Sequence, residues 1–255
     1  TGELDFAVLP VNLAAKLYNS GIGYVALAVV GNGMVQLLTS NPGISAFPDL
    51  AGNTVYIAGQ GATPEYVMRA IAGFYKIPML VREEAKSGEI SVRFNMPYPE
   101  MAGALASGKI ETAVLPEPFA TIARIANPGL REPFSVAQEW QKATGMKDYP
   151  MTLLVVSASL EKNFPGLVKA FALEYEKSIK RVLQYPEEAG KFAEELGFGL
   201  KASVAATSIS RANYVYIPAT NAVKELTALL EIFLKEAPEA IGGKLPDKNF
   251  YSPVK

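Results

Sequence analysis

The 255-residue sequence contains neither cysteine nor histidine. Without thiol or imidazole groups it has no disulfide, no thiolate or imidazole metal site, and no Ser-His or Cys-His catalytic pair. It also offers no convincing pair of catalytic carboxylates, because Asp5 and Glu111 stand at equivalent strand starts, where a structural role explains both. We therefore expect no catalytic residue, no metal and no cofactor.

A strong net charge and a long apolar run are also lacking. The 24 Lys and Arg residues nearly balance the 25 Asp and Glu residues, so the charge gives no reason to expect a nucleic acid or an anionic membrane as partner. The longest apolar stretch, residues 24–38, is interrupted by Gly31-Asn32-Gly33, which excludes a membrane span. No signal peptide is visible. An apolar fraction of 49% suits a globular protein with buried sheets.

One phrase occurs twice in the chain. Residues 2–10 (GELDFAVLP) and 108–116 (GKIETAVLP) each place a glycine, a charged, an apolar and an acidic residue before a strand that ends in Val-Leu-Pro. A helix is predicted after both copies. The apolar run at 4–9 is typical of an inner parallel strand. Two such copies predict two similar α/β lobes.

Strands and helices alternate through the first three-quarters of the chain, which predicts parallel sheets. The last quarter is predicted to be nearly all helical. We expect an α/β fold with mixed, mostly parallel sheets and a helical C-terminal tail. The expected strands are 4–9, 24–30, 54–58, 90–94, 112–115 and 151–156, and the expected helices are 11–19, 64–76, 98–107, 117–127, 164–185, 186–196, 201–210 and 219–236.

The loop at residues 59–64 (GQGATP) is the strongest local candidate for ligand contact. It follows a predicted strand; Thr63 can cap the next helix and Pro64 suits the first helical position. Glycines allow a ligand to approach the backbone, and free amides at a helix start attract anions. Gly61, Ala62 and Thr63 are thus candidate ligand contacts, although a tight strand–helix turn explains the loop equally well.

Other polar residues also follow predicted strands, where open α/β sheets bind their ligands. Asn32 and Gly33 form one such loop, although Asn-Gly pairs are most often turn residues. Asn12 has the alternative role of a helix N-cap, Asn95 that of a loop residue, and Glu117 that of a partner for a helix dipole. Trp140 and Tyr149 offer ring surfaces, but packing is the favoured role for each.

Taken together, these phrases resemble the substrate-binding proteins of ABC importers. The similar branch serves nitrate, sulfonates, taurine and thiamine-pyrimidine precursors, and consists of NMT1-like periplasmic binding proteins of type 2. The resemblance spans essentially the whole chain and depends on the order of several phrases. These are residues 2–10 with Asn12, 47–52 with the loop at 59–63, 104–108, 111–118 and 242–251.

The resemblance implies two α/β lobes that close on a ligand. Lobe one would comprise 1–42 and 148–255, lobe two 43–147, with hinges near 35–42 and 146–153. The family begins with a strand–helix–strand–helix unit that this sequence does not contain, so we expect lobe one to lack its first unit. The expected ligand contacts are Asn12, Asn32 and Gly33 from lobe one, and Gly61, Ala62, Thr63, Asn95 and Glu117 from lobe two.

By the same resemblance, the expected function is that of a non-enzymatic extracytoplasmic receptor. It would be a monomer that captures a sulfonate- or nitrate-like anion, or a vitamin or pyrimidine precursor, and delivers it to the permease subunits of an ABC transporter. It would be periplasmic, or held at the membrane as a lipoprotein by an N-terminal segment outside this sequence. The alternatives are a small-molecule lyase of the menaquinone-pathway type on the same scaffold and the effector domain of a transcription factor.

Overall fold

The computed structural model describes residues 4–254, and the chain divides into two compact units. Unit 1 contains the residues up to Gly33, Tyr149–Pro186 and the residues from Asn213 onward; unit 2 contains Met34–Asp148 and Glu187–Ala212. Gly2 and Glu3 of the first copy of the repeated phrase lie outside the described residues. No helix in the described part of the chain is long and apolar enough to cross a membrane.

These units depart from the expected lobe boundaries in two places. Residues 34–42 group with unit 2, because strand β3 (Val35–Thr39) pairs with β7 (Thr112–Pro116) in the sheet of that unit. Residues 187–212, expected in lobe one, also group with unit 2, where helix α9 (Ala202–Ile209) packs on α4 (Phe119–Ala126). The chain leaves unit 1 after Gly33 and first returns after Asp148.

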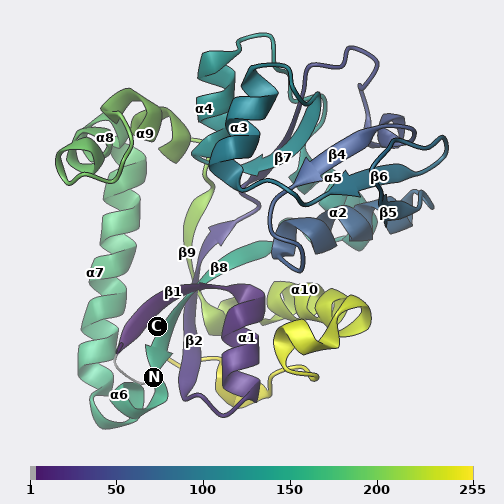
Figure 1. The fold of residues 1–255 in the computed structure, drawn as a ribbon. Coiled ribbons are helices and arrows are strands. Elements are labelled where there is room, and N and C mark those ends of the chain that lie inside the picture. Colours follow the sequence, from purple (N-terminus) through teal and green to yellow (C-terminus); the bar gives the residue numbers. More distant parts are fainter. Residues whose placement is uncertain (1–3, 255) are drawn as a thin grey trace. The chain divides into compact units, whose positions relative to one another are not determined.

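Unit 1 is built on a four-stranded sheet in the order β1-β8-β2-β9 (Figure 1). Helix α7 lies along one face of this sheet, and α1 and α10 pack together on the other. Its elements are β1 (Phe6–Pro10), α1 (Val11–Asn19), β2 (Tyr24–Asn32), β8 (Pro150–Ser157), α6 (Ala158–Asn163), α7 (Pro165–Gln184), β9 (Tyr214–Pro218), η2 (Ala219–Asn221), α10 (Val223–Glu236), η3 (Pro238–Ile241) and η4 (Lys248–Phe250).

The ladders of this first sheet are antiparallel, which corrects the expectation of an inner parallel strand at 4–9. β8 runs between β1 and β2 in the opposite direction to both, with Val8 opposite Leu154 and Val25 opposite Val156. β1 therefore lies at the edge of the sheet. A buried apolar run indicates how deeply a strand lies but not the direction of its neighbours, and β8 enters from a distant part of the sequence.

Helix α1 buries a different face from the one its leucines suggest. Val11, Ala14 and Ala15 are fully buried, whereas Leu13 is 38% exposed. Small residues on the buried face allow the helix to lie close to its neighbours. In α10 the buried face follows the helical spacing of its large apolar residues, because Leu226, Leu229, Leu230 and Phe233 are all fully buried.

Unit 2 contains a five-stranded sheet in the order β3-β7-β4-β6-β5. β7, β4, β6 and β5 are parallel, as expected, and β3 is antiparallel to β7. The α/β class is thus confirmed, with one antiparallel sheet and one mixed, mostly parallel sheet. The remaining elements of this unit are η1 (Phe47–Leu50), β4 (Thr54–Ile57), α2 (Thr63–Phe74), β5 (Met79–Val81), β6 (Ile90–Arg93), α3 (Tyr98–Ala106), α5 (Val136–Thr144) and α8 (from Pro186 to Glu195).

Helices cover both faces of this second sheet (Figure 1). α3 and α4 share one face, where Met101, Leu105 and Ala120 pack with Leu115 of β7 in one buried cluster. α2 and α5 pack against each other on the other face. With both faces covered, a mostly parallel sheet exposes its loops at the strand ends, and these loops carry the candidate ligand contacts.

Candidate ligand-binding site

The polar loops of unit 2 lie at one edge of its sheet. β7, β4 and β6 are parallel neighbours, so the loops that follow them start from the same edge. The loop after β4 carries Gly61, Ala62 and Thr63, the loop after β6 carries Asn95, and the loop after β7 carries Glu117. The unit therefore collects all five of its candidate residues at the carboxyl edge of its parallel strands.

The helix that follows the loop at 59–62 differs from expectation at its first residues. α2 begins at Thr63 with Ala62 as its N-cap, and no side chain caps it, so Thr63 is not the expected cap. The backbone N–H of Gly61 donates to Oε2 of Glu65 at 2.7 Å, and Arg69 Nε donates to Oε1 of the same carboxylate at 2.8 Å. The glycine amide that we expected to attract an anion already binds a buried carboxylate of its own helix.

Glu117 connects three elements at this edge. Its Oε1 accepts a hydrogen bond from Gln36 Nε2 of β3 at 2.7 Å, and its Oε2 accepts one from the backbone N–H of Thr121 in α4 at 3.1 Å. The bond from Thr121 satisfies a backbone amide in the first turn of α4. The predicted interaction of Glu117 with a helix start is therefore present as a direct hydrogen bond. Glu117 is thereby oriented by groups of the chain itself.

Several buried polar atoms near this edge make no hydrogen bond within residues 4–254. They are Oε1 of Gln36, Oγ1 of Thr63 and Oγ1 of Thr121. The three side chains belong to residues that are 8%, 3% and 2% exposed, respectively. Because buried polar atoms are nearly always hydrogen-bonded in native proteins, these three oxygens are exceptions to that rule within the described residues.

An aromatic pair stands at the same edge. Tyr98 and Phe119 are the first residues of α3 and α4, and their rings stack with centroids 5.6 Å apart at an interplanar angle of 17°. Burial raises the pKa of the Tyr98 phenol, so this hydroxyl stays neutral over the physiological range. Both rings remain partly exposed. They provide a flat apolar surface at this edge.

The candidate residues of unit 1 also share one sheet edge. β1 and β2 both run antiparallel to β8, so Asn12 after β1 and Asn32 with Gly33 at the end of β2 lie at the same end of the sheet. Asn12 is not an N-cap, because α1 begins at Val11 after the cap residue Pro10. Oδ1 of Asn32 is buried and has no hydrogen-bond partner in the part of the chain that the structure describes.

The Asn32–Gly33 segment is held in place through its backbone. Asn32 N–H donates to the carbonyl of Asn213 at 3.2 Å, and Gly33 N–H donates to the carbonyl of Tyr149 at 2.9 Å. β2 extends through Gly31 and Asn32, so this segment is the end of a strand and not the free turn that its sequence suggested. Strand pairing consequently fixes the backbone of Asn32.

Two aromatic residues that could have offered ring surfaces serve packing. Trp140 and Tyr149 are both fully buried, and Trp140 Nε1 donates to the carbonyl of Asp148 at 3.2 Å. No cluster of three acidic side chains that could hold a metal ion occurs among the described residues.

Sequence reasoning missed Gln36, Phe119 and Thr121. Gln36 carried a usable signal, because it is the only polar residue in the apolar run at 34–38, and a buried amide needs a partner. Phe119 directly follows the Pro116-Glu117-Pro118 phrase and could have been grouped with Tyr98 as a helix-start aromatic. Nothing in the sequence distinguishes Thr121 from a solvent-facing helix residue.

Two α/β units with polar loops at the sheet edges define a periplasmic-binding-protein fold of type 2. No protein-family model and no curated protein sequence matches the chain. Solved structures do match. An ABC transporter protein from Parabacteroides distasonis is 26% identical over 99% of this chain and 82% of its own, with a TM-score of 0.81.

Two further structures are similar in fold at lower identity. The periplasmic aliphatic sulphonate binding protein SsuA from Escherichia coli is 15% identical, with 95% of this chain and 79% of that chain covered and a TM-score of 0.69. The desulfurization enzyme DSZB is 12% identical, with 98% and 84% covered and a TM-score of 0.63. The fold is that of ABC-transporter substrate-binding proteins of the SsuA-like kind, as the sequence resemblance implied.

Proposed function

We propose that this protein is the extracytoplasmic substrate-binding component of an ABC importer, which captures a small organic molecule and delivers it to the permease. The fold likeness to the Parabacteroides distasonis protein supports the class. The main observation behind the proposal is that the buried side-chain oxygens of Gln36, Thr63 and Thr121, at the carboxyl edge of the unit 2 sheet, have no hydrogen-bond partner within the described residues.

The chemistry of this edge favours a ring-containing ligand over a small anion. Gly61 N–H is already bonded to Glu65, and Glu117 adds a second carboxylate to the same edge. Arg69 balances the charge of Glu65, so Glu117 is the carboxylate that disfavours a nitrate- or sulfonate-like anion here, whereas the stacked Tyr98 and Phe119 rings offer a surface for a planar group. Of the two expected ligand classes, we therefore favour the vitamin or pyrimidine precursor.

The polar groups of unit 1 would complete the site. The side chains of Asn12 and Asn32 would contribute hydrogen bonds to the same ligand as Thr63, Asn95 and Glu117 of unit 2, and Gly33, whose N–H is bonded to Tyr149, would only allow close approach. A ligand held by both units favours whichever arrangement of the units allows both sets of contacts, so binding would lower the radius of gyration in solution. Small-angle scattering with and without ligand measures that change.

The first experiment identifies the ligand. Native mass spectrometry of the purified protein would reveal a co-purified molecule, and thermal-shift screening would compare thiamine-pyrimidine precursors with taurine, alkanesulfonates and nitrate. We expect a pyrimidine-containing compound to raise the melting temperature most, because binding to the native state alone stabilises it. If no compound shifted the melting temperature and none co-purified, the receptor proposal would fail.

Two asparagine variants test the site without disturbing the core. Asn95 is exposed and Asn12 half-buried, and neither side chain makes a hydrogen bond within the described residues. We expect Asn95→Ala and Asn12→Ala each to weaken ligand binding about five- to tenfold, the loss of one hydrogen bond. Asn163→Ala, an exposed asparagine at the end of α6, is the matched control and should bind as wild type.

An enzymatic role is the second candidate, favoured by the likeness to the desulfurization enzyme. Any such chemistry would have to proceed without cysteine or histidine, since the chain has neither. Incubation of the identified ligand with purified protein, followed by mass spectrometry of the solution, distinguishes the two. Recovery of unchanged ligand supports a receptor, whereas a product that disappears in Glu117→Gln supports an enzyme.

A further inference from the structure

Unit 1 contains a cavity that is separate from the sheet edge described above. It has a volume of about 440 Å³ and opens to solvent between helix α10 and the C-terminal segment. A volume of this size suits a small organic molecule. The lining residues are Thr220, Val223, Thr227, Leu230, Leu245, Pro246, Lys248 and Tyr251.

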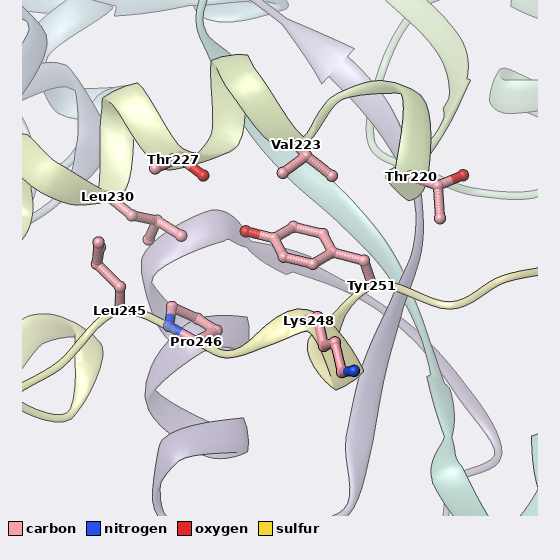
Figure 2. A pocket seen from close by; sticks show the side chains of 8 residues that line it. All are labelled: Thr220, Val223, Thr227, Leu230, Leu245, Pro246, Lys248 and Tyr251. Atoms are coloured by element: carbon pink, nitrogen blue, oxygen red, sulfur yellow. The ribbon is translucent and has the colours of Figure 1, made fainter.

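Most of the cavity wall is apolar, and a tyrosine ring crosses it. Figure 2 shows the Tyr251 ring beneath Val223, with its hydroxyl pointing toward the space below Leu230. The backbone beside this ring is anchored, because Tyr251 forms a parallel bridge with Ala26 of β2 and Ser252 N–H donates to the Ala26 carbonyl at 2.9 Å. The ring is therefore a fixed wall of the cavity.

Four polar groups that line the cavity have no partner within residues 4–254. The hydroxyls of Thr220, Thr227 and Tyr251 and the ammonium group of Lys248 make no hydrogen bond or ion pair there. Figure 2 shows the Thr227 oxygen on the side of α10 that faces the Tyr251 hydroxyl. Two hydroxyls directed into one apolar space can bind the same polar group of a ligand.

The charge of the cavity has one sign. Lys248 is the only charged residue among those that line it, and it lies on the side opposite α10. The adjacent Asp247 lines a different depression, where it accepts a hydrogen bond from the Tyr18 hydroxyl at 2.7 Å. The flexible lysine stem lets the ammonium group approach an anion at the cavity, in competition with the adjacent Asp247 carboxylate, which it attracts electrostatically.

We propose that this cavity is a second small-molecule site, which binds an amphipathic monocarboxylate with an apolar chain or ring. The apolar body would pack on the Tyr251 ring, Leu230 and Leu245, and the carboxylate would take the Lys248 ammonium group as its partner. The hydroxyls of Tyr251 and Thr227 would bind a polar atom of the ligand. This site does not depend on the importer function, because its residues include none of those proposed above to contact the transported molecule.

The probe for this site is 4-phenylbutyrate, with neutral 4-phenylbutyramide for comparison. Titration of isotopically labelled full chain, followed by NMR, should give saturable shifts at Thr227, Leu230 and Tyr251 in the millimolar range. Lys248→Gln should weaken binding of the carboxylate about threefold at low salt, the size typical of an exposed ion pair. Binding of the amide should not change in this variant.

Controls separate this site from general adsorption. Lys244→Gln removes the same charge from the neighbouring depression and should bind the probe as wild type. Val223→Trp should abolish binding by filling the cavity, with Thr227→Phe as a second filling variant in case the first does not fold. The proposal is overturned if the filled variants still bind, if Lys248→Gln and Lys244→Gln weaken binding equally, or if the shifts do not saturate.

Discussion

The side-chain amide of Gln36 donates a hydrogen bond to Glu117 at 2.7 Å and so joins β3 to the end of β7. Glu117 also accepts the Thr121 amide of α4 at 3.1 Å. Glu117→Ala would leave the buried Gln36 amide without this partner. We predict that it lowers the free energy of unfolding by about 1–3 kcal/mol without any ligand, as measured by urea denaturation.

Glu100→Ala provides the comparison, because Glu100 is an exposed first-turn residue of α3 and has no hydrogen bond among the described residues. It should change the free energy of unfolding by no more than about 0.5 kcal/mol. If Glu117→Ala left the free energy of unfolding unchanged, Glu117 would not stabilise the fold, and ligand contact would be its only proposed role.

Gly190 of α8 allows close contact with α9. A Cβ atom at this position would lie 2.3 Å from the carbonyl oxygen of Ala202 and 3.0 Å from the backbone nitrogen of Ala206. Backbone atoms cannot rotate away, so Gly190→Ala must separate the two helices. We predict a loss of about 1–3 kcal/mol in the free energy of unfolding, measured by chemical denaturation.

Gly166→Ala in α7 is the matched control, because a Cβ atom added at Gly166 would have no neighbouring atom within 4 Å. Alanine has the higher helix propensity, so this variant should be neutral or more stable by up to about 1 kcal/mol. Equal destabilisation by both substitutions would show that the α8–α9 contact does not restrict the side chain at position 190.

Tyr18 and Asp247 make stability depend on pH at both extremes. The Tyr18 hydroxyl and then the Asn249 amide bind the Asp247 carboxylate and lower its pKa. The ionised Asp247 carboxylate therefore stabilises the fold fully above its unfolded-state pKa of about 3.9. This stabilisation is lost as the pH falls through its lower pKa in the folded state. Burial and then the bond to Asp247 raise the pKa of Tyr18 to about 12, so stability is lost as the pH rises from about 10 toward that value.

Asp247→Asn should accordingly reduce the fall in melting temperature between neutral and strongly acidic solution, and Tyr18→Phe should reduce the fall above about pH 10. Asp5→Asn, which changes an exposed carboxylate just before β1, should keep the wild-type profile. Melting curves recorded by circular dichroism across the pH range test the predictions for Asp247→Asn and Tyr18→Phe. Profiles of the two variants that coincide with wild type would mean that the Tyr18–Asp247 hydrogen bond does not form in solution.

Helix positions were largely predictable because their signals are local. α7 was expected at 164–185 and is found at Pro165–Gln184, and α10 was expected at 219–236 and is found at Val223–Glu236. α5 was missed although its ends carry signals, since Ser135 caps it and Gly145 follows in the left-handed conformation. β9 was missed because it has only five residues, which are too few to show a strand's alternation of apolar and polar residues within a mostly helical region.

Strand directions and site contacts were less predictable because they depend on distant residues. The antiparallel arrangement of the first sheet follows from β8, which is more than a hundred residues from its partners in sequence. The loops at the sheet edge could be chosen from sequence, but not their bonds. The hydrogen bonds from the Gly61 N–H to Glu65 and from Gln36 to Glu117 depend on where side chains lie in the folded unit.

β1 presents an uncharged edge. It is the first strand in the sheet order and pairs only with β8 within residues 4–254. Val8 is 49% exposed, and residues 6–10 carry no charge. An apolar edge strand without a protecting charge is a template for association with other chains. We predict that Val8→Lys slows heat-induced aggregation, measured by static light scattering.

The stability of Val8→Lys should change by no more than about 0.5 kcal/mol, since the side chain is half exposed and its backbone pairing with Leu154 persists. Ile125→Lys is the comparison, because Ile125 is 56% exposed but lies on helix α4, where no strand edge is available. If both lysine variants slowed aggregation equally, exposed apolar area would be the cause. Slower aggregation in Val8→Lys alone assigns it to the open edge of β1.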